Sequence, residues 1–198
     1  MTGVAKYHRW FQRLALPFVQ LAFHIHFKLH IVGRENIPEG GCVVCPNHKH
    51  NSDPPLAACG ISNRHSIRIM AKKELFEIRG LSWLITWLGA FPVDRSRADL
   101  TAIKTALQAV KDGNKLLIFP QGTRGASENG AKDGAAMLAL KTKAPIVPMY
   151  ITEKKEKHGR VNVIIGKPFL PDPKSKDYAA LSQEIMRRIY ELKPEEER

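Results

Sequence analysis

Short apolar runs separated by charged or helix-forming segments are the feature that most constrains the fold of this chain. Each run contains β-branched residues and is bounded by turn-forming residues, which is typical of buried strands. The runs are Cys42–Cys45, Ile67–Met70, Leu116–Phe119, Ile146–Ile151 and Val161–Ile165. Strands that alternate with helices predict an α/β domain with a mixed or mostly parallel sheet flanked by helices.

Helical patterns occupy the intervals between these runs. The clearest predicted helix extends from Asp99 to Lys111, with its apolar residues on one face and Gly113 as the stop. Shorter helices are predicted at 54–59 and 133–142, and a closing amphipathic helix ends before Pro194. The chain has 198 residues, enough for one well-buried core, but the order of the strands cannot be predicted from these patterns.

The net charge of the chain limits the kinds of partner that it is expected to bind. Its formal net charge is +12, which predicts attraction to nucleic acid, to an acidic carrier protein or to an anionic membrane surface. No nucleic-acid motif and no strand with interleaved aromatic and basic residues is present, so nucleic acid is not expected. The three cysteines lack zinc-ribbon spacing and are too few for a disulfide framework, which favours a reducing cytosol.

The first 34 residues contain basic and apolar residues but no acidic one. This composition is typical of a segment that lies on a membrane surface. A spanning helix is not expected, because Pro17 and several polar residues interrupt the apolar run. We therefore predict a membrane-associating segment at 1–30 and a globular domain at 31–198. An ordinary amphipathic helix that covers the domain remains the alternative.

A polar turn follows the first apolar run and contains a histidine with an aspartate five residues later. On a continuous helix His48 and Asp53 would lie about 140° apart, whereas a turn between them lets the side chains meet. Pro54 predicts that a helix starts there, with Asp53 as its N-cap. A carboxylate beside one imidazole nitrogen would fix the tautomer and leave the other nitrogen as a general base.

Other interpretations of this turn stay open. A histidine near an aspartate is often only structural. Cys45 could be a thiol nucleophile, although a cysteine in an apolar strand is usually buried. His48, His50 and Asp53 could form a metal site, but a base must keep its nitrogen unligated, so no metal is predicted.

Four segments occur in the order that is found in the glycerolipid acyltransferases, the enzymes with the NH(x4)D motif. Asn47, His48 and Asp53 match that motif, and Gly89–Arg95 resembles the second. Phe119–Gly125 resembles the third, FPEGTRS, and Ile146–Ile151 resembles the fourth, V-P-V-x-I. The resemblance covers roughly residues 30–170 and is closest to the 1-acylglycerol-3-phosphate (lysophosphatidic acid) acyltransferases, which implies their α/β fold.

The resemblance also implies which residues bind substrate. Lys72, with Lys73 as second choice, Arg95 and Arg124 would hold the phosphate of the acceptor. The remaining substrate-binding residues that it implies are Asn47, Gln121, Gly122 and Thr123. Three positions depart from the family pattern: Gln121 replaces a glutamate, Gly125 replaces a serine, and His50 stands where a serine is usual.

The implied reaction moves a fatty acyl group from a thioester to the sn-2 hydroxyl of 1-acylglycerol 3-phosphate, which yields phosphatidic acid. His48 would remove the hydroxyl proton, Asp53 would orient it, and backbone amides near the His48 loop would stabilise the oxyanion. No cofactor is expected, because the thioester of acyl carrier protein or coenzyme A is itself a substrate. The enzyme would work at the cytoplasmic face of the cell membrane.

Rival functions remain. A related acyltransferase could use glycerol 3-phosphate or another lysolipid, because the motifs are shared. A basic membrane-surface protein without catalysis is the rival from another class. Gln121 leaves room for a degenerate homologue, since it lacks the carboxylate of the family's glutamate.

Overall fold

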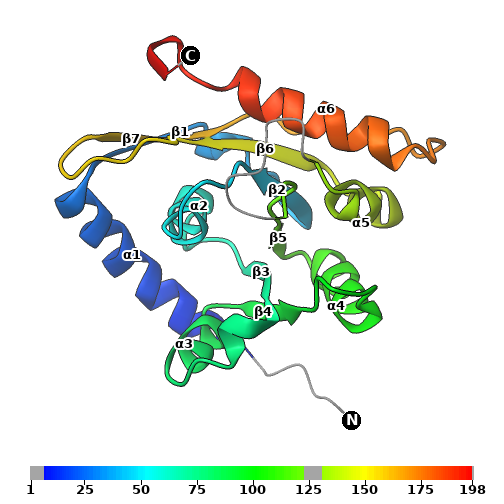
Figure 1. The fold of residues 1–198 in the computed structure, drawn as a ribbon, viewed down its shortest axis with the longest axis horizontal. Helices are drawn as coiled ribbons and strands as arrows, with labels where there is room; N and C mark the ends of the chain where they lie inside the picture. The colour runs from blue at the N-terminus through cyan, green and yellow to red at the C-terminus, as the bar shows by residue number, and fades with distance from the viewer. Residues whose placement is uncertain (1–6, 123–130, 198) are drawn as a thin grey trace.

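A single seven-stranded sheet organises the protein (Figure 1). The computed structural model describes residues 7–122 and 131–197. The strands are β1 (Lys28–Val32), β2 (Cys42–Pro46), β3 (Ile67–Lys72), β4 (Ala90–Val93), β5 (Lys115–Leu117), β6 (Ile146–Ile151) and β7 (Arg160–Ile165). Their order across the sheet is β1-β7-β6-β2-β5-β3-β4.

All neighbouring strands run parallel except β6 and β7, which are antiparallel. The predicted α/β fold with a mixed, mostly parallel sheet is therefore confirmed. Parallel strands point their carboxyl ends to the same edge of a sheet, where α/β proteins commonly bind ligands. The loops that follow β2, β3, β4, β5 and β6 all leave from that edge.

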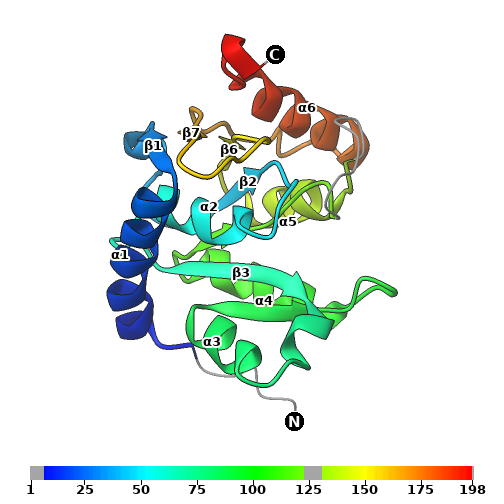
Figure 2. The same ribbon diagram turned by 60° about the vertical axis from the view of Figure 1, so that its left-hand side comes forward.

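Helices cover both faces of the sheet and create two cores. The α-helices are α1 (Arg9–His26), α2 (Asp53–Ile61), α3 (Leu81–Trp87), α4 (Leu100–Lys111), α5 (Gly134–Thr142) and α6 (Tyr178–Glu191). Buried residues of α1 and α2 form one core with the sheet, and those of α4, α5 and α6 form the other. Figures 1 and 2 show these two groups of helices on opposite sides. Short 3₁₀ turns occupy 34–36, 73–76 and 195–197.

Two strands, β1 and β4, were absent from the sequence prediction. β1 alternates basic and apolar residues, and Leu29 is buried while its neighbours Lys28 and His30 are exposed. This period of two is a strand signal inside a segment that was interpreted as helix only. The predicted boundary between residues 30 and 31 falls within β1, which pairs with β7. The N-terminal helix is thus continuous with the sheet.

The inner side of α1 is bound to the domain by polar contacts as well as by packing. Gln12 is buried, donates to the carbonyls of Ile67 and Leu88, and accepts from the amide of Ile67. Pro17 cannot donate to the carbonyl four residues earlier, which belongs to Arg13. The side-chain amide of Asn63 donates to that carbonyl instead, at 3.4 Å, so the helix continues through its proline.

The outer side of α1 is apolar and exposed. Its residues Trp10, Leu14, Phe18, Leu21 and Ile25 recur every three or four positions, and each is more than half exposed. Trp83 of α3 is also 52% exposed and contacts Phe11 of α1 through their rings. We call these six exposed residues of α1 and α3 the apolar face. Within residues 7–122 and 131–197, no helix has the length and hydrophobicity to cross a bilayer.

Candidate active site

The loop after β2 brings His48 and Asp53 together. The Nδ1 atom of His48 lies 3.1 Å from Oδ2 of Asp53. The prediction that Asp53 caps the helix was wrong: α2 begins at Asp53 itself, after Ser52 as N-cap. The next two residues are prolines without N–H groups, and the amide of Leu56 donates to the carbonyl of Ser52, whereas the carboxylate of Asp53 turns back to the loop.

Both carboxylate oxygens of Asp53 are occupied. Oδ2 also accepts from the backbone amides of Lys49 (2.7 Å) and His50 (2.6 Å), and Oδ1 binds the ammonium of Lys155 at 2.8 Å. Burial alone would raise the pKa of Asp53. The hydrogen bond from His48 and the charge of Lys155 outweigh burial and hold this pKa below its ordinary value. Asp53 is therefore ionised at neutral pH.

The ring of His48 is held on two sides. A carboxylate beside Nδ1 favours the tautomer with the proton on Nδ1, which leaves Nε2 with a free lone pair. The ring packs against Phe119 with centroids 4.2 Å apart, and its side chain is 12% exposed. This arrangement suits a general base that is fixed in place but reachable by a substrate.

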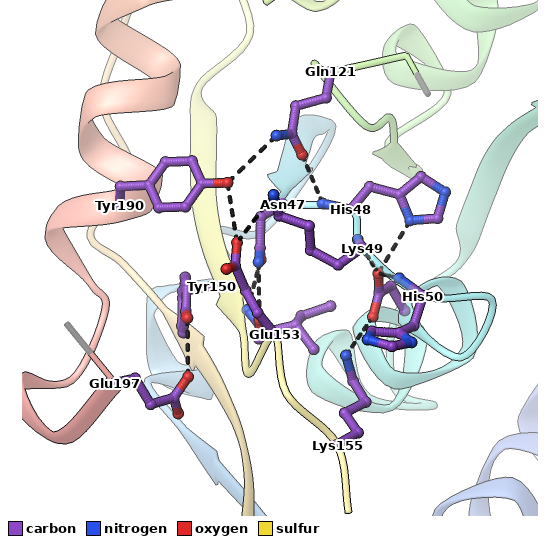
Figure 3. A network of polar contacts seen from close by, with 12 residues as sticks. Asn47, His48, Lys49, His50, Gln121, Tyr150, Glu153, Lys155, Tyr190 and Glu197 are labelled. Carbon is purple, nitrogen blue, oxygen red and sulfur yellow. Dashed lines mark hydrogen bonds and ion pairs between the residues drawn. The ribbon is translucent and has the colours of Figure 1, made fainter. Parts of the chain in front are cut away.

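Gln121 supports the loop from behind. Its Oε1 atom accepts from the backbone amide of His48 at 2.8 Å, and its Nε2 donates to the hydroxyl of Tyr190 at 3.3 Å. That hydroxyl lies 3.2 Å from Oε1 of Glu153, to which it can donate (Figure 3). Gln121 is only 1% exposed. A contact with substrate was predicted for this amide, but the structure uses it to position the His48 backbone.

Asn47, like Gln121, is a buried amide that supports the His48 loop. Its amide donates to the carbonyl of Ile151 at 2.9 Å and accepts from the backbone amide of Ile151 at 2.7 Å. The residue is 1% exposed, so its polar atoms face β6 and not a substrate. The structure therefore gives Asn47, like Gln121, a positioning role: it ties the His48 loop to β6.

These contacts also occupy the expected oxyanion donors. The backbone N–H of His48 donates to Gln121, and those of Lys49 and His50 donate to Asp53. An oxyanion hole requires donors aimed at the developing charge. The prediction that amides of the His48 loop stabilise the oxyanion therefore fails for these three.

A cavity of about 270 Å³ lies beside Phe119, whose ring contacts His48. Its polar lining consists of the basic residues Arg95, Arg97 and Lys132, the acidic residues Asp94 and Asp99, and Gly122. The guanidinium of Arg95 donates to the carbonyl of Gly122. The apolar side of the cavity is lined by Met70, Ile103, Ile118, Met137 and Leu138. A cavity with basic groups beside an apolar interior matches an amphiphilic anion.

Other predicted phosphate ligands lie elsewhere. Lys72 is half exposed, 3.5 Å from Glu74, and does not line the cavity. The ammonium of Lys73 contacts Asp94 at 2.8 Å, and this bond, with others from Ser96, holds the pKa of Asp94 well below its usual range. Thr123 and Arg124 lie outside the described residues. Of the predicted substrate ligands that the structure describes, Arg95 and Gly122 are the two that line the cavity.

The two rival chemistries of the loop find no support. Cys45 is fully buried, and burial raises the pKa of its thiol, which keeps it protonated and unreactive. Among the described residues, no three His, Cys, Asp or Glu side chains are placed to hold a metal ion.

Sequence reasoning missed three residues of the site: Lys155, Glu153 and Tyr190. The first two lie on the turn after β6, and the third lies on α6. The signal available for Lys155 and Glu153 was their position after the fourth motif. That motif is a strand, and the carboxyl end of a parallel strand lies at the ligand-binding edge of a sheet. Tyr190 had no such signal and belonged to an ordinary amphipathic pattern.

The chain is similar to known proteins in sequence. A family model described as Acyltransferase matches residues 28–152. A protein of Bacillus subtilis named 1-acyl-sn-glycerol-3-phosphate acyltransferase is 34% identical over 173 residues, which are 82% of this chain and 86% of that protein. A Streptococcus pneumoniae protein of the same name is 34% identical over 76% of this chain and 59% of its own length.

A solved structure is also similar. It is the crystal structure of the 1-acyl-sn-glycerophosphate (LPA) acyltransferase from Thermotoga maritima. The two chains have a TM-score of 0.72 and 28% identity, over 93% of this chain and 81% of the other. The fold, the dyad and the cavity thus occur in a chain that is similar to the three acyltransferases named above.

Proposed function

The chain is a member of the acyltransferase family, and we propose that it transfers a fatty acyl group from an acyl thioester to the sn-2 hydroxyl of 1-acylglycerol 3-phosphate. The product is phosphatidic acid. The observation that carries this proposal is the His48–Asp53 dyad, whose ring contacts Phe119 at the wall of a basic and apolar cavity.

The cavity supports an acceptor with a phosphate and an acyl chain. Arg95 presents a planar fork of donors that suits phosphate oxygens, and Lys132 adds a second positive charge. The apolar side of the cavity would bury methylene groups of a fatty acyl chain. An acceptor held in this way would have its free hydroxyl near the dyad. The translational and rotational entropy of the acceptor would then be lost on binding and not in the chemical step.

The chemical step needs one base. Nε2 of His48 accepts the hydroxyl proton while the acceptor oxygen forms a bond to the thioester carbonyl carbon. The tetrahedral intermediate then expels the thiolate, which takes the proton from the imidazolium. Asp53 stays ionised and stabilises the positive charge that His48 carries in between. In this scheme the acceptor attacks the thioester directly, without an acyl-enzyme, and the buried Cys45 does not act as a nucleophile.

The apolar face supports work at a lipid surface. Its tryptophans and aliphatic side chains would enter the region between headgroups and acyl chains, where amphipathic helices bind. The net charge of +12 attracts an anionic bilayer that holds both substrate and product. We therefore propose peripheral binding, at the cytoplasmic face of the membrane. The same charge suits either anionic donor, acyl carrier protein or coenzyme A.

The test measures phosphatidic acid formed on anionic vesicles that contain lysophosphatidic acid and a labelled acyl thioester. Wild type should form product and His48→Ala should not, with folding and vesicle binding unchanged. Glycerol 3-phosphate replaces lysophosphatidic acid in a parallel reaction. Product from that acceptor alone would assign the chain to the rival substrate, and lipid binding without any product would identify a non-catalytic membrane protein.

A further inference from the structure

Lys155 is the least exposed charged group next to the dyad. It lies on the turn between β6 and β7, and its side chain is 4% exposed (Figure 3). Its neighbour Lys154 on the same turn is exposed. Burying an ammonium group is unfavourable unless it is paired at close range, and Lys155 is paired at 2.8 Å with Asp53. The turn therefore delivers this one lysine to the carboxylate.

We propose that Lys155 is a positioning residue for the base: it fixes the rotation of the Asp53 carboxylate and offsets its charge, so that the carboxylate holds the His48 ring in one orientation. The proposal deepens the function given above and, for its kinetic part, rests on it. Lys155 touches neither the reacting atoms nor the cavity lining described here, and it acts through Asp53.

The geometric part follows from the contacts of the two oxygens. Lys155 binds Oδ1, and this leaves Oδ2 for Nδ1 of His48 and for the amides of Lys49 and His50. A carboxylate bound on both sides cannot rotate without losing contacts on each. A free Oδ1 would allow the carboxylate to turn and the imidazole to lose its partner.

The electrostatic part follows from the signs of the charges. An isolated buried carboxylate next to an imidazole stabilises the imidazolium, which is not a base. A positive charge on the far side of the carboxylate opposes that effect, because interactions in a poorly solvated site are weakly screened. Lys155 supplies such a positive charge, because its ammonium forms an ion pair with the Asp53 carboxylate.

Other charged or titratable groups also surround the loop. The charged or titratable residues on the elements packed there are Lys49, His50, Arg95, Lys132, Glu153 and Tyr190. Glu153 is engaged by Lys49 at 3.8 Å and by the hydroxyl of Tyr190, so this carboxylate has its own partners. Arg95 lies beside Gly122. Among the charged side chains named in this paragraph and Lys155, the contact to the Asp53 carboxylate described above is that of Lys155.

The first test needs no substrate. The pH at which the His48 imidazole takes up its proton is measured by NMR titration in wild type, Lys155→Met and Lys155→Arg, with His48→Gln to assign the signal. Lys155→Met should move the midpoint up by on the order of one pH unit, whereas Lys155→Arg should keep it. Lys154→Met removes an equal charge from the same turn and should leave the midpoint in place.

The second test is kinetic. The acid limb of the kcat/KM profile should shift upward in Lys155→Met by the same amount as the NMR midpoint. A loss of rate at every pH without a shift would mean a merely structural ion pair and would overturn the proposal. So would an equal shift in Lys154→Met. If Lys155→Met does not fold, Lys155→Gln takes its place. Absence of turnover in wild type would refute the proposed function while the NMR result still decides this inference.

Discussion

The two sides of the site are built in opposite ways. On the side of the base, the polar atoms of Asn47, Asp53 and Gln121 all bind other protein atoms, and these residues are almost fully buried. On the side of the cavity, Arg95 is exposed, and Arg97 pairs with Asp94 at 3.1 Å while its side chain stays 78% exposed. The first set of contacts is closed to solvent, whereas the arginines of the second set remain accessible to it.

This difference indicates that one side of the site orients the base and the other side provides affinity for the substrate. A base must be held in one geometry to act, and buried hydrogen bonds between protein groups provide that. A binding site for an anion must stay open, so its cations remain exposed until a ligand covers them. Substitutions on the base side should change turnover or stability, and those on the cavity side should change KM.

The largest effect should come from Asp53→Asn. Its amide has one carbonyl oxygen, which can accept from His48 or from Lys155 but not from both, and its NH₂ group then faces a donor. We expect kcat to fall by on the order of 10³- to 10⁴-fold. Steady-state rates on vesicles measure this, and a fall of less than tenfold would contradict the role of Asp53.

This variant leaves Lys155 buried without a charge partner, which should cost about 3–5 kcal/mol of stability. Asp53→Asn with Lys155→Met removes both charges and should recover much of the folding while staying inactive. Stability also depends on pH here. Because the folded pKa of Asp53 lies below its ordinary 3.8, its contribution is present above that pH and is lost as the pH falls. The double variant should lack this part of the acid sensitivity in thermal unfolding.

Arg95→Ala should have the next largest effect. Loss of a charge-assisted contact of about 1.5–3 kcal/mol would raise KM for the acceptor roughly tenfold to a hundredfold. Thermal stability should stay unchanged, because the side chain is exposed. Lys72→Ala is the matched control: it removes a cation outside the cavity and should alter KM much less. Equal effects of the two would show that the cavity is not the phosphate site.

Phe18→Ser tests the apolar face and should weaken binding to anionic vesicles by about tenfold, since burying a large apolar side chain stabilises by roughly 1.5–3 kcal/mol. Phe18 is 72% exposed, so folding should not change. Leu170→Ser is the control, because Leu170 is 70% exposed but lies outside the apolar face. Sedimentation with vesicles gives both values, and equal losses would count against membrane contact by α1.

The smallest effect should follow from Tyr190→Phe. It removes the hydroxyl between Gln121 and Glu153 and leaves the ring in place. About 1 kcal/mol of stability should be lost, and kcat should fall only a few-fold, because Gln121 keeps its bond to His48. Thermal unfolding and vesicle kinetics measure the two quantities. A loss near that of Asp53→Asn would place Tyr190 in the chemistry itself.

The sequence allowed the fold class and the dyad to be predicted for local reasons. Apolar runs mark strands wherever they pair, and His48 and Asp53 are close in the chain. Lys155 binds Asp53 from 102 residues away, and no local pattern contains that contact. Gln121 shows a different limit, because a polar residue in a motif can face either a ligand or the protein interior.

Gln12 has a consequence for the membrane binding that we propose. Its three hydrogen bonds join α1 to the carbonyl and amide of Ile67 and to the carbonyl of Leu88. The apolar face is therefore rigidly attached to the domain and is not connected to it through a flexible linker. In the proposed binding mode, the height and tilt of His48 above the lipid headgroups would be set when the protein folds, before any membrane is present. A lysolipid would then have to move out of the bilayer only by the fixed distance between the lipid headgroups and His48.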